Sequence, residues 1–286
     1  MSDAPSLLLI WDFDSAIGQV NATFPYNFNE QRIVEESRNV DTLLAMAGEA
    51  NVRMTFACVG FAAESGVFPY HVPEQIRRIR AAGHEIASHS WRHEWFPFLE
   101  REQVRRSLDR SKAALEECLG EPGAVRGFVP PFSRPMTWYR KGAISLGDRA
   151  FGPLRAAADI GALCRALRVS GYAWCRVAHR SLAQRLTRRR TRALIRTRAD
   201  RCAGIACLPQ HYTGFDAPAL ALIDRALATG RSIVINGHPS ALTRDGSESL
   251  ATLRPFLARV TELQAQGRLR ARTVADHLAR ESAMPT

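Results

Sequence analysis

The sequence predicts an α/β fold, an irregular (β/α) barrel of about seven parallel strands with helices on the outside. Three observations predict this class. Short apolar runs alternate along the chain with longer segments whose apolar residues recur every three or four positions. The first run, Ser6–Trp11, is apolar throughout, which is typical of a strand buried on both faces of a parallel sheet. Neither G-x-G-x-x-G nor a P-loop marks a doubly wound nucleotide-binding sheet, so a barrel is favoured over an open sheet.

The first half of the chain supplies four strands and three helices. The strands are predicted at Ser6–Trp11, Val52–Val59, Glu85–Ser88 and Ala124–Val129. Asn29 can cap the first helix, and Gly48 is a suitable residue to end it. Pro73 suits the first turn of the second helix, which should stop at Gly83. The third helix, Val104–Cys118, has the clearest apolar stripe in the sequence.

The same alternation returns in the last third of the chain. Strands are predicted at Ile205–Leu208 and Ser232–Asn236, and helices at about Pro218–Ala228 and Leu250–Gln266. Thr273 and Asp276 form a start resembling a capping box for a last short helix. Because these units repeat the strand–helix order of the first half, we expect them in the same sheet.

The stretch between Ser133 and Gly204 is too long to be a loop without structure of its own. Apolar residues from Phe151 to Leu167 recur at helical spacing, and Arg176–Arg201 holds ten arginines in 26 positions. We interpret residues 134–204 as a helical insertion or lid within a single domain that spans residues 1–286.

Composition is that of an ordinary globular protein, with 46% hydrophobic and 23% charged residues, and it excludes a disordered chain. The net charge is +11, and only two of the 39 basic residues are lysines. Two explanations remain open. One is a coding bias with solvated helix faces; the other is attraction to an anionic partner such as a nucleotide, a lipid phosphate, a membrane face or nucleic acid.

The six cysteines contain no C-x-x-C pair, so we expect free thiols that behave as small apolar groups, not a disulfide framework. The N-terminal apolar run is short and flanked by Asp3 and Asp12, unlike a signal peptide. No segment approaches the length of a membrane span. The expected location is the cytoplasm.

Three polar clusters directly follow predicted strands: Asp12-Phe13-Asp14, His89 to His93, and His238. In a parallel barrel the strand ends meet at one face, where loops build the site. Two carboxylates after an apolar strand are costly to bury unless they are paired or bind metal. Histidines four residues apart on a helical turn point the same way and suit one metal. Each cluster alone also has an ordinary explanation as core or surface residues; their joint placement is what indicates a site.

These motifs resemble those of the polysaccharide deacetylase family, the NodB-homology fold of carbohydrate esterase family 4. Asp12-Phe13-Asp14 resembles the D-x-D variant of the first motif, found in an intracellular and allantoinase-like branch. His89-Ser90-x-x-His93 meets the second motif, H-[ST]-x-x-H. Gly127–Ser133 resembles the third, G-F-R-x-P, and His238-Pro239 resembles the fifth. The resemblance spans Leu7–Phe132 and Ile205–Leu278.

The resemblance implies a role for each matched residue. Asp14, His89 and His93 would hold a divalent metal, Asp12 would be the general base and His238 the general acid. A backbone N–H near Phe132 would stabilise the oxyanion. Further residues expected to contact the substrate are Pro131, Trp91 and Tyr26.

Two positions depart from the family pattern. Val129 stands where relatives have an arginine that orients the base, and Arg126 or Arg134 are the candidate replacements. No Asp followed by Trp supports the catalytic histidine, and Asp216 is the candidate for that position. His84 is expected to be structural, and we expect the four remaining histidines on the surface: His71, His179, His211 and His277.

The predicted activity is metal-dependent removal of an N-acyl group, N-acetyl in the first instance, from an amino sugar or sugar conjugate. Zinc is the expected metal, with iron, cobalt or nickel as alternatives. A cyclic-amide hydrolase of the allantoinase type and a non-catalytic carbohydrate- or anion-binding relative are the competing interpretations. The arginines leave a phosphate-bearing substrate and a peripheral membrane contact open. Nucleic acid is disfavoured, since no recognisable module accompanies the charge.

Overall fold

The computed structural model describes residues 4–22, 30–96, 99–133, 159–179 and 199–283. The strands are β1 Ser6–Phe13, β2 Thr55–Cys58, β3 Glu85–Ser88, β4 Gly127–Phe128, β5 Trp174–Cys175, β6 Asp200–Cys202, β7 Ile205–Cys207, β8 Tyr212–Thr213, β9 Ile233–Gly237 and β10 Arg270–Arg272. The α-helices are α1 Ser15–Ala22, α2 Glu30–Glu49, α3 Pro73–Ala81, α4 Arg101–Leu119, α5 Ile160–Val169, α7 Ala217–Thr229, α8 Leu250–Ala265 and α9 Val274–Ala283. Short 3₁₀ turns are η1 Gly60–Ala63, η3 Pro131–Ser133 and η4 Pro239–Ala241.

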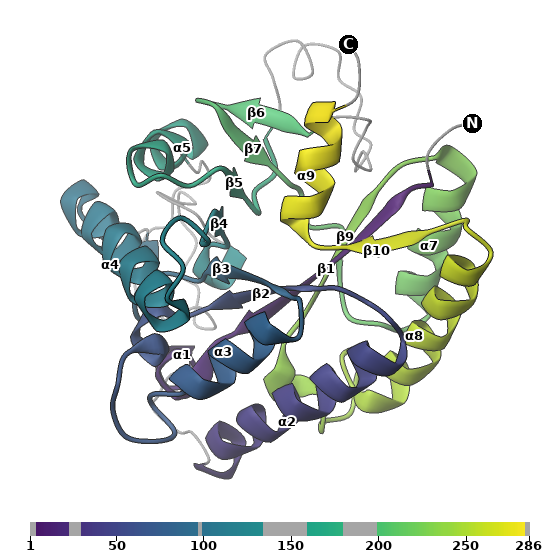
Figure 1. Cartoon of the computed structure of the whole chain (residues 1–286), viewed down its shortest axis with the longest axis horizontal. Helices are drawn as coiled ribbons and strands as arrows, with labels where there is room; N and C mark the ends of the chain where they lie inside the picture. Colours follow the sequence, from purple (N-terminus) through teal and green to yellow (C-terminus); the bar gives the residue numbers. More distant parts are fainter. Residues whose placement is uncertain (1–3, 23–29, 97–98, 134–158, 180–198, 284–286) are drawn as a thin grey trace, which may run out of the picture.

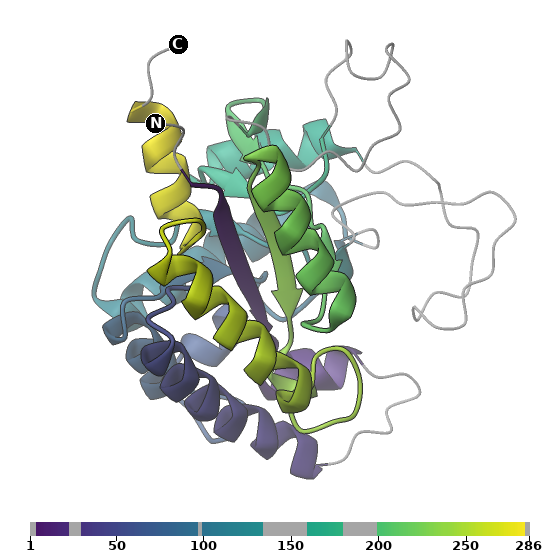
Figure 2. The same ribbon diagram turned by 90° about the vertical axis from the view of Figure 1, so that its right-hand side faces the viewer.

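These strands form one curled sheet with helices on its outer side (Figure 1). Their order is β6-β7-β5-β4-β3-β2-β1-β9-β8, and β10 pairs with the first half of β1. Neighbours run parallel except β6 and β7. Figure 2 shows α7 and α8 covering the part of the sheet that contains β1 and β9. The predicted (β/α) barrel of parallel strands is therefore confirmed.

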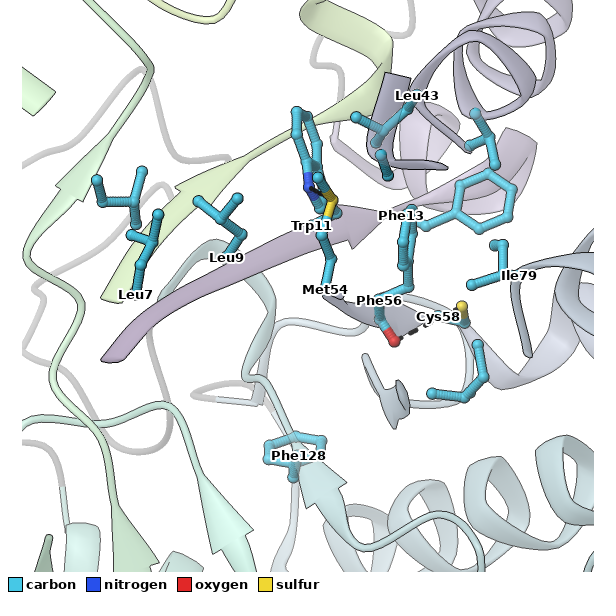
Figure 3. Packing of buried hydrophobic residues seen from close by; sticks show 14 of the residues in the cluster. Leu7, Leu9, Trp11, Phe13, Leu43, Met54, Phe56, Cys58, Ile79 and Phe128 are labelled. Atoms are coloured by element: carbon cyan, nitrogen blue, oxygen red, sulfur yellow. Dashed lines mark hydrogen bonds between the residues drawn. The ribbon is translucent and has the colours of Figure 1, made fainter. Parts of the chain in front are cut away.

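Alternation along β1 divides the core into two layers. Leu7, Leu9, Trp11 and Phe13 point outward into the layer under the helices, where Figure 3 shows them with residues of β2, α2 and α3. The even-numbered positions point inward and form a smaller cluster inside the barrel: Leu8, Ile10, Ala57, Ala87, Val129, Trp174, Ala206, Leu208, Val234 and Val274. Because side chains on a strand alternate with a period of two, the next inward position on β1 is Asp12.

The region expected to be a helical insertion needs correction where the structure describes it. Residues 159–179 and 199–204 form α5, β5 and β6, and β5 lies between β4 and β7 in the main sheet. These strands have only two and three residues, so they give almost no periodic signal in the sequence. The remainder, 134–158 and 180–198, which includes most of the arginine-rich segment, lies outside the described residues.

A buried carboxylate closes the amino-terminal end of the barrel, where the strands begin. Glu85, the first residue of β3, accepts hydrogen bonds from the hydroxyl of Thr55, the indole N–H of Trp174 and the backbone N–H of Ala275, each at 2.9 Å. Burial raises the pKa of Glu85, although these bonds oppose the rise. The last of them joins the barrel to the first turn of α9. In the part of the chain that is described, no helix is both long and apolar enough to cross a membrane.

Candidate active site

Polar side chains gather at the carboxyl-terminal end of the barrel, where the parallel strands finish. Asp12 ends the inward row of β1, His89 follows β3, Arg176 follows β5 and His238 follows β9. Asp12, His89 and Arg176 each stand two residues beyond an inward apolar residue of β1, β3 or β5, and His238 stands two beyond Asn236, the next inward position after Val234. Strand alternation therefore aims all four at the same interior. Asp12, His89 and Arg176 are almost fully buried, and about one third of the His238 side chain is exposed.

Asp14, His89 and His93 converge on one point. The Oδ1 atom of Asp14 lies 3.4 Å from Nε2 of His89 and 3.5 Å from Nε2 of His93, and the three ligand atoms all lie within 4.8 Å of one another. All three residues are buried, and Asp14 Oδ1 has no hydrogen-bond donor among the described residues. Such a trio with two imidazoles and one carboxylate is a typical divalent-metal site with open positions.

Both imidazoles are prepared to act as ligands. The Nδ1 atom of His89 lies 2.8 Å from the carbonyl oxygen of Val129, and donation to that carbonyl leaves Nε2 to face Asp14. Burial lowers the pKa of His93 to about 4, although Asp14 opposes the shift, so its ring is neutral at pH 7. Asp14 is ionised, because His93 and His89 outweigh the effect of burial and lower its pKa. Neutral imidazole and ionised carboxylate are the forms that bind a metal.

The loop from His89 to His93 is not the helical turn that the spacing suggested. Ser90 and His93 adopt left-handed φ values of 68° and 59°, and the two imidazole rings meet with centroids 4.9 Å apart. Ser15, Phe132 and Ser133 also have positive φ, so five of the seven such non-glycine residues in the described chain border this site. Strained backbone of this kind concentrates at functional sites.

Arg176 holds Asp12 in a two-point ion pair. Its NH1 donates to Oδ1 of Asp12 and its NH2 donates to Oδ2, both at 2.7 Å, and NH1 also donates to the side-chain oxygen of Asn236. Burial raises the pKa of Asp12, but Arg176, His89 and His238 outweigh it, and the net shift is downward. The carboxylate is therefore ionised and fixed in orientation.

The sequence does not identify Arg176 as the partner of the base. Val129 leaves the arginine position of the third motif empty after β4, and the adjacent strand β5 fills it, since the N–H of Arg176 donates to the carbonyl of Phe128. The suggested replacement Arg126 is exposed and precedes β4, at the opposite end of the strand. Arg134 lies outside the described residues. The inward–outward alternation of Trp174, Cys175 and Arg176 is the one signal that could have indicated this role.

Glu248 holds His238. One carboxylate oxygen of Glu248 lies 2.7 Å from Nδ1 of His238 and accepts the backbone N–H of His238 at 2.7 Å. The Nε2 atom lies 3.8 Å from Oδ2 of Asp12. Burial lowers the pKa of His238, but Glu248 and Asp12 outweigh it and raise the pKa to about 9. Asp216, suggested for this support, instead accepts a hydrogen bond from the hydroxyl of Tyr212. No sequence motif marks Glu248, which lies in the loop before α8.

The predicted substrate contacts fall in different places. The ring of Phe132 packs on that of His93 with centroids 4.6 Å apart, which brings η3, with Pro131, beside the metal trio. The predicted backbone oxyanion donor near Phe132 remains a prediction. Trp91 is buried in the outer core and meets Phe61 edge-on, so it packs and does not face the site. Tyr26 lies outside the described residues.

Two histidines expected on the surface are buried. His211 accepts the N–H of Val234 at 2.9 Å, and Nε2 of His277 lies 3.1 Å from a carboxylate oxygen of Glu281. His84 accepts the N–H of Met54, and burial lowers its pKa to about 4, in keeping with the structural role expected of it. Spacing along the chain cannot separate such satisfied core histidines from solvated ones.

Comparison with known proteins gives a matching family model for part of the chain and similar folds for nearly all of it. The sequence model of the family described as polysaccharide deacetylase matches residues 23–151. Similar solved structures include a proposed polysaccharide deacetylase from Mycobacterium smegmatis, 19% identical with a TM-score of 0.66, where the match covers 99% of this chain and 92% of that one. The Puue allantoinase is 14% identical with a TM-score of 0.65, covering 98% and 90%. A family 4 carbohydrate esterase from Streptomyces lividans, in complex with acetate, is 15% identical with a TM-score of 0.50, covering 96% and 94%. A search of curated protein sequences found no match.

Proposed function

We propose that the chain is a member of the polysaccharide deacetylase family and acts as a cytoplasmic, metal-dependent hydrolase. The proposed reaction removes the N-acyl group, N-acetyl in the first instance, from an amino sugar or sugar conjugate. One observation carries the proposal. The trio of Asp14, His89 and His93 lies directly beside an ionised Asp12 and a His238 with a raised pKa.

The residues of the trio fit a divalent metal. Asp14 Oδ1 is a buried, charged oxygen without a donor among the described residues, which is costly unless a cation satisfies it. Two imidazole nitrogens and one carboxylate oxygen suit zinc first, with iron, cobalt or nickel as alternatives. When bound there, a metal would lower the pKa of a water molecule and polarise the acyl oxygen.

Asp12 is suited to accept the proton of the attacking water. Its ion pair with Arg176 keeps it ionised, and a carboxylate offers about four lone-pair sites, so the two arginine bonds leave acceptor capacity for a proton. Its Oδ2 lies 4.0 Å from Nε2 of His89 and 3.8 Å from Nε2 of His238. The base therefore stands between the metal trio and the acid.

His238 is suited to protonate the departing amine. With a pKa of about 9 it carries a proton at pH 7, and Glu248 on Nδ1 leaves Nε2 as the donor toward the site. An amide does not cleave readily unless its nitrogen is protonated, so the pair of an ionised Asp12 and a protonated His238 divides the proton transfers between two residues.

Two other functions compete with this one. The likeness in fold to the Puue allantoinase keeps a cyclic-amide hydrolase as the second candidate. A relative that binds a carbohydrate or an anion without catalysis would keep the fold and need neither the base nor the acid.

The test combines metal analysis with acyl release. We expect about one divalent metal per chain. Acetate should be released from one or more members of a panel of acetamido sugars, their nucleotide forms and their lipid-phosphate conjugates. The double variant His89→Ala, His93→Ala should lose both metal and activity. Asp12→Asn should keep the metal and lose about 10²–10⁴-fold in turnover.

Each alternative gives a different result in the same experiment. Full metal occupancy in the double variant rules out the metal site. Ring opening of allantoin without acetate release from any sugar supports the second candidate. Sugar binding without product from either class identifies a non-catalytic relative.

A further inference from the structure

One turn on the surface exposes several large apolar side chains. Four such side chains are exposed in the described part of the chain, and three of them lie between η1 and α3: Val67 at 77%, Phe68 at 54% and Tyr70 at 40%. The fourth, Val169, is 72% exposed at the end of α5. Single exposed apolar residues are ordinary, but three within four positions make a patch that requires an explanation. Residues 67–70 are called the apolar turn below.

The apolar turn has a fixed shape. The carbonyl of Val67 accepts the N–H groups of Tyr70 and His71 at 3.0 and 3.1 Å, and Val72 donates to the carbonyl of Ala62 at 2.8 Å, so the loop closes at its base. Gly66 lies so close to His71 that a Cβ there would fall 2.2 Å from the imidazole. The apolar side chains are thus presented outward by a preformed turn.

Two arginines lie at the base of the turn. The guanidinium of Arg110 covers the ring of Trp91 at 3.9 Å and pairs with Glu64 at 3.3 Å. The guanidinium of Arg92 lies 5.2 Å from the ring centroid of Phe61, and the backbone N–H of Arg92 donates to the carboxylate of Glu94 at 2.9 Å. Arg92 and Arg110 are exposed, and the whole chain carries a net charge of +11. An apolar tip with cations at its base complements a surface that is negative outside and apolar beneath.

The turn is adjacent to the candidate active site. Gly60 and Phe61 of η1 donate backbone hydrogen bonds to the carbonyls of Ser90 and Trp91 at 2.9 and 2.8 Å, which fastens η1 to the loop that carries His89 and His93. The loop that leads from η1 into α3 projects from the molecule at the lower left of Figure 1, the side toward which β1 and β2 run. A surface that meets the apolar turn therefore lies beside the site.

We propose that the apolar turn inserts into the interface of an anionic lipid bilayer, with Arg92 and Arg110 on the headgroup phosphates. Phe and Tyr side chains favour the membrane–water interface, and basic residues add attraction to anionic lipid. Docking of this kind would place the site at the bilayer surface, where a lipid-linked substrate presents its headgroup. The lipid contact needs no turnover, so it can fail or succeed independently of the proposed hydrolase activity.

The experiment is co-sedimentation of the full chain with vesicles, either of phosphatidylcholine alone or with about one third phosphatidylglycerol. The wild-type chain should bind the anionic vesicles and leave the neutral ones. Val67→Ser, Phe68→Ser should weaken that binding at least about tenfold. The matched control is Val169→Ser, which removes an equally exposed valine away from the turn and should bind like the wild type. Circular dichroism checks the fold of each variant, and Val67→Ser alone replaces the double variant if that one does not fold.

Three outcomes would overturn the proposal. The first is absence of wild-type binding to anionic vesicles. The second is binding that high salt abolishes but the turn variants leave unchanged, since the arginines alone would then carry it. The third is a fall in oligomeric mass of the double variant on analytical ultracentrifugation, which would make the turn a contact between two copies of the chain.

Discussion

The two ends of the barrel both bury carboxylates, and they satisfy them in opposite ways. At the amino-terminal end Glu85 accepts hydrogen bonds from three neutral donors, and burial raises its pKa. At the carboxyl-terminal end Asp12 accepts hydrogen bonds from the guanidinium of Arg176, and its pKa is lowered despite equal burial. Neutral donors join strands and helix without keeping a reactive group charged, whereas a cation keeps the carboxylate ionised and ready to take a proton.

The two ends also contribute to stability with opposite dependence on pH. A carboxyl whose pKa rises on folding binds protons more readily in the folded state, so Glu85 costs stability as pH rises above its unfolded value near 4.5. A carboxyl whose pKa falls on folding, such as Asp12, contributes stability above its unfolded value near 3.8 and loses it as pH falls through the folded value. The amino-terminal end therefore contributes most to stability in acid, and the carboxyl-terminal end contributes most near neutrality.

The largest effect should follow from removing the cation, Arg176, at the carboxyl-terminal end of the barrel. Arg176→Gln should lower kcat by about 10²-fold or more, because Asp12 loses its orientation and its pKa rises. It should also lower the free energy of unfolding by about 3–5 kcal/mol, since a buried charge is left unpaired. Arg176→Lys keeps the charge without the two-point geometry and should fall between. The matched control is Arg126→Gln, which should leave kcat unchanged; an equal loss in both variants would remove Arg176 from this role.

A substitution at the amino-terminal end of the barrel should change stability alone. Glu85→Ala leaves the indole of Trp174, the hydroxyl of Thr55 and the N–H of Ala275 without their acceptor, and it should lower the free energy of unfolding by about 3 kcal/mol. Denaturant titration measures this change, and kcat assayed well below the melting temperature should stay at the wild-type value. A fall in kcat without a fall in stability would show that the two ends are not independent.

The smallest effect should be a displaced pH profile. Glu248→Gln removes the main group that raises the pKa of His238, so this pKa should fall from about 9 toward its ordinary value. The protonated acid exists below its pKa, and the alkaline limb of kcat should therefore move to lower pH. A variant pKa near 7 leaves about a tenth of the acid protonated at pH 8. Asp216→Asn is the control and should leave the limb in place; a shift in the control but not in Glu248→Gln would reverse the two roles.

Residues that carry their signal within a short stretch could be predicted from the sequence. Asp12 and Asp14 follow a long apolar strand, and His89 and His93 share one motif, so their meeting needs only that parallel strands end together. The apolar stripe of α4 likewise predicted that helix to within a few residues.

Partners that depend on the order of strands in the sheet could not be predicted. Arg176 replaces the expected arginine because β5, a strand of two residues, lies next to β4. Glu248 reaches His238 from a loop with no periodicity at all. Arg176 is the partner of Asp12, and Glu248 is the partner of His238. Asp12 and His238 each require a partner of suitable charge and length, but they do not determine where in the chain that partner lies.

The central position of β1 has a consequence for the order in which the protein is made. β1 pairs with β2 on one side, but its other partners, β9 and β10, begin at residues 233 and 270. During synthesis the metal trio, complete at residue 93, leaves the ribosome long before Arg176, His238 and Glu248. Pairing across so many residues is slow, and until it occurs one edge of β1, which is apolar from Leu7 to Trp11, stays open. The three residues of the trio are thus made early, whereas their neighbours Arg176, His238 and Glu248 reach the site only after the C-terminal half of the chain is made.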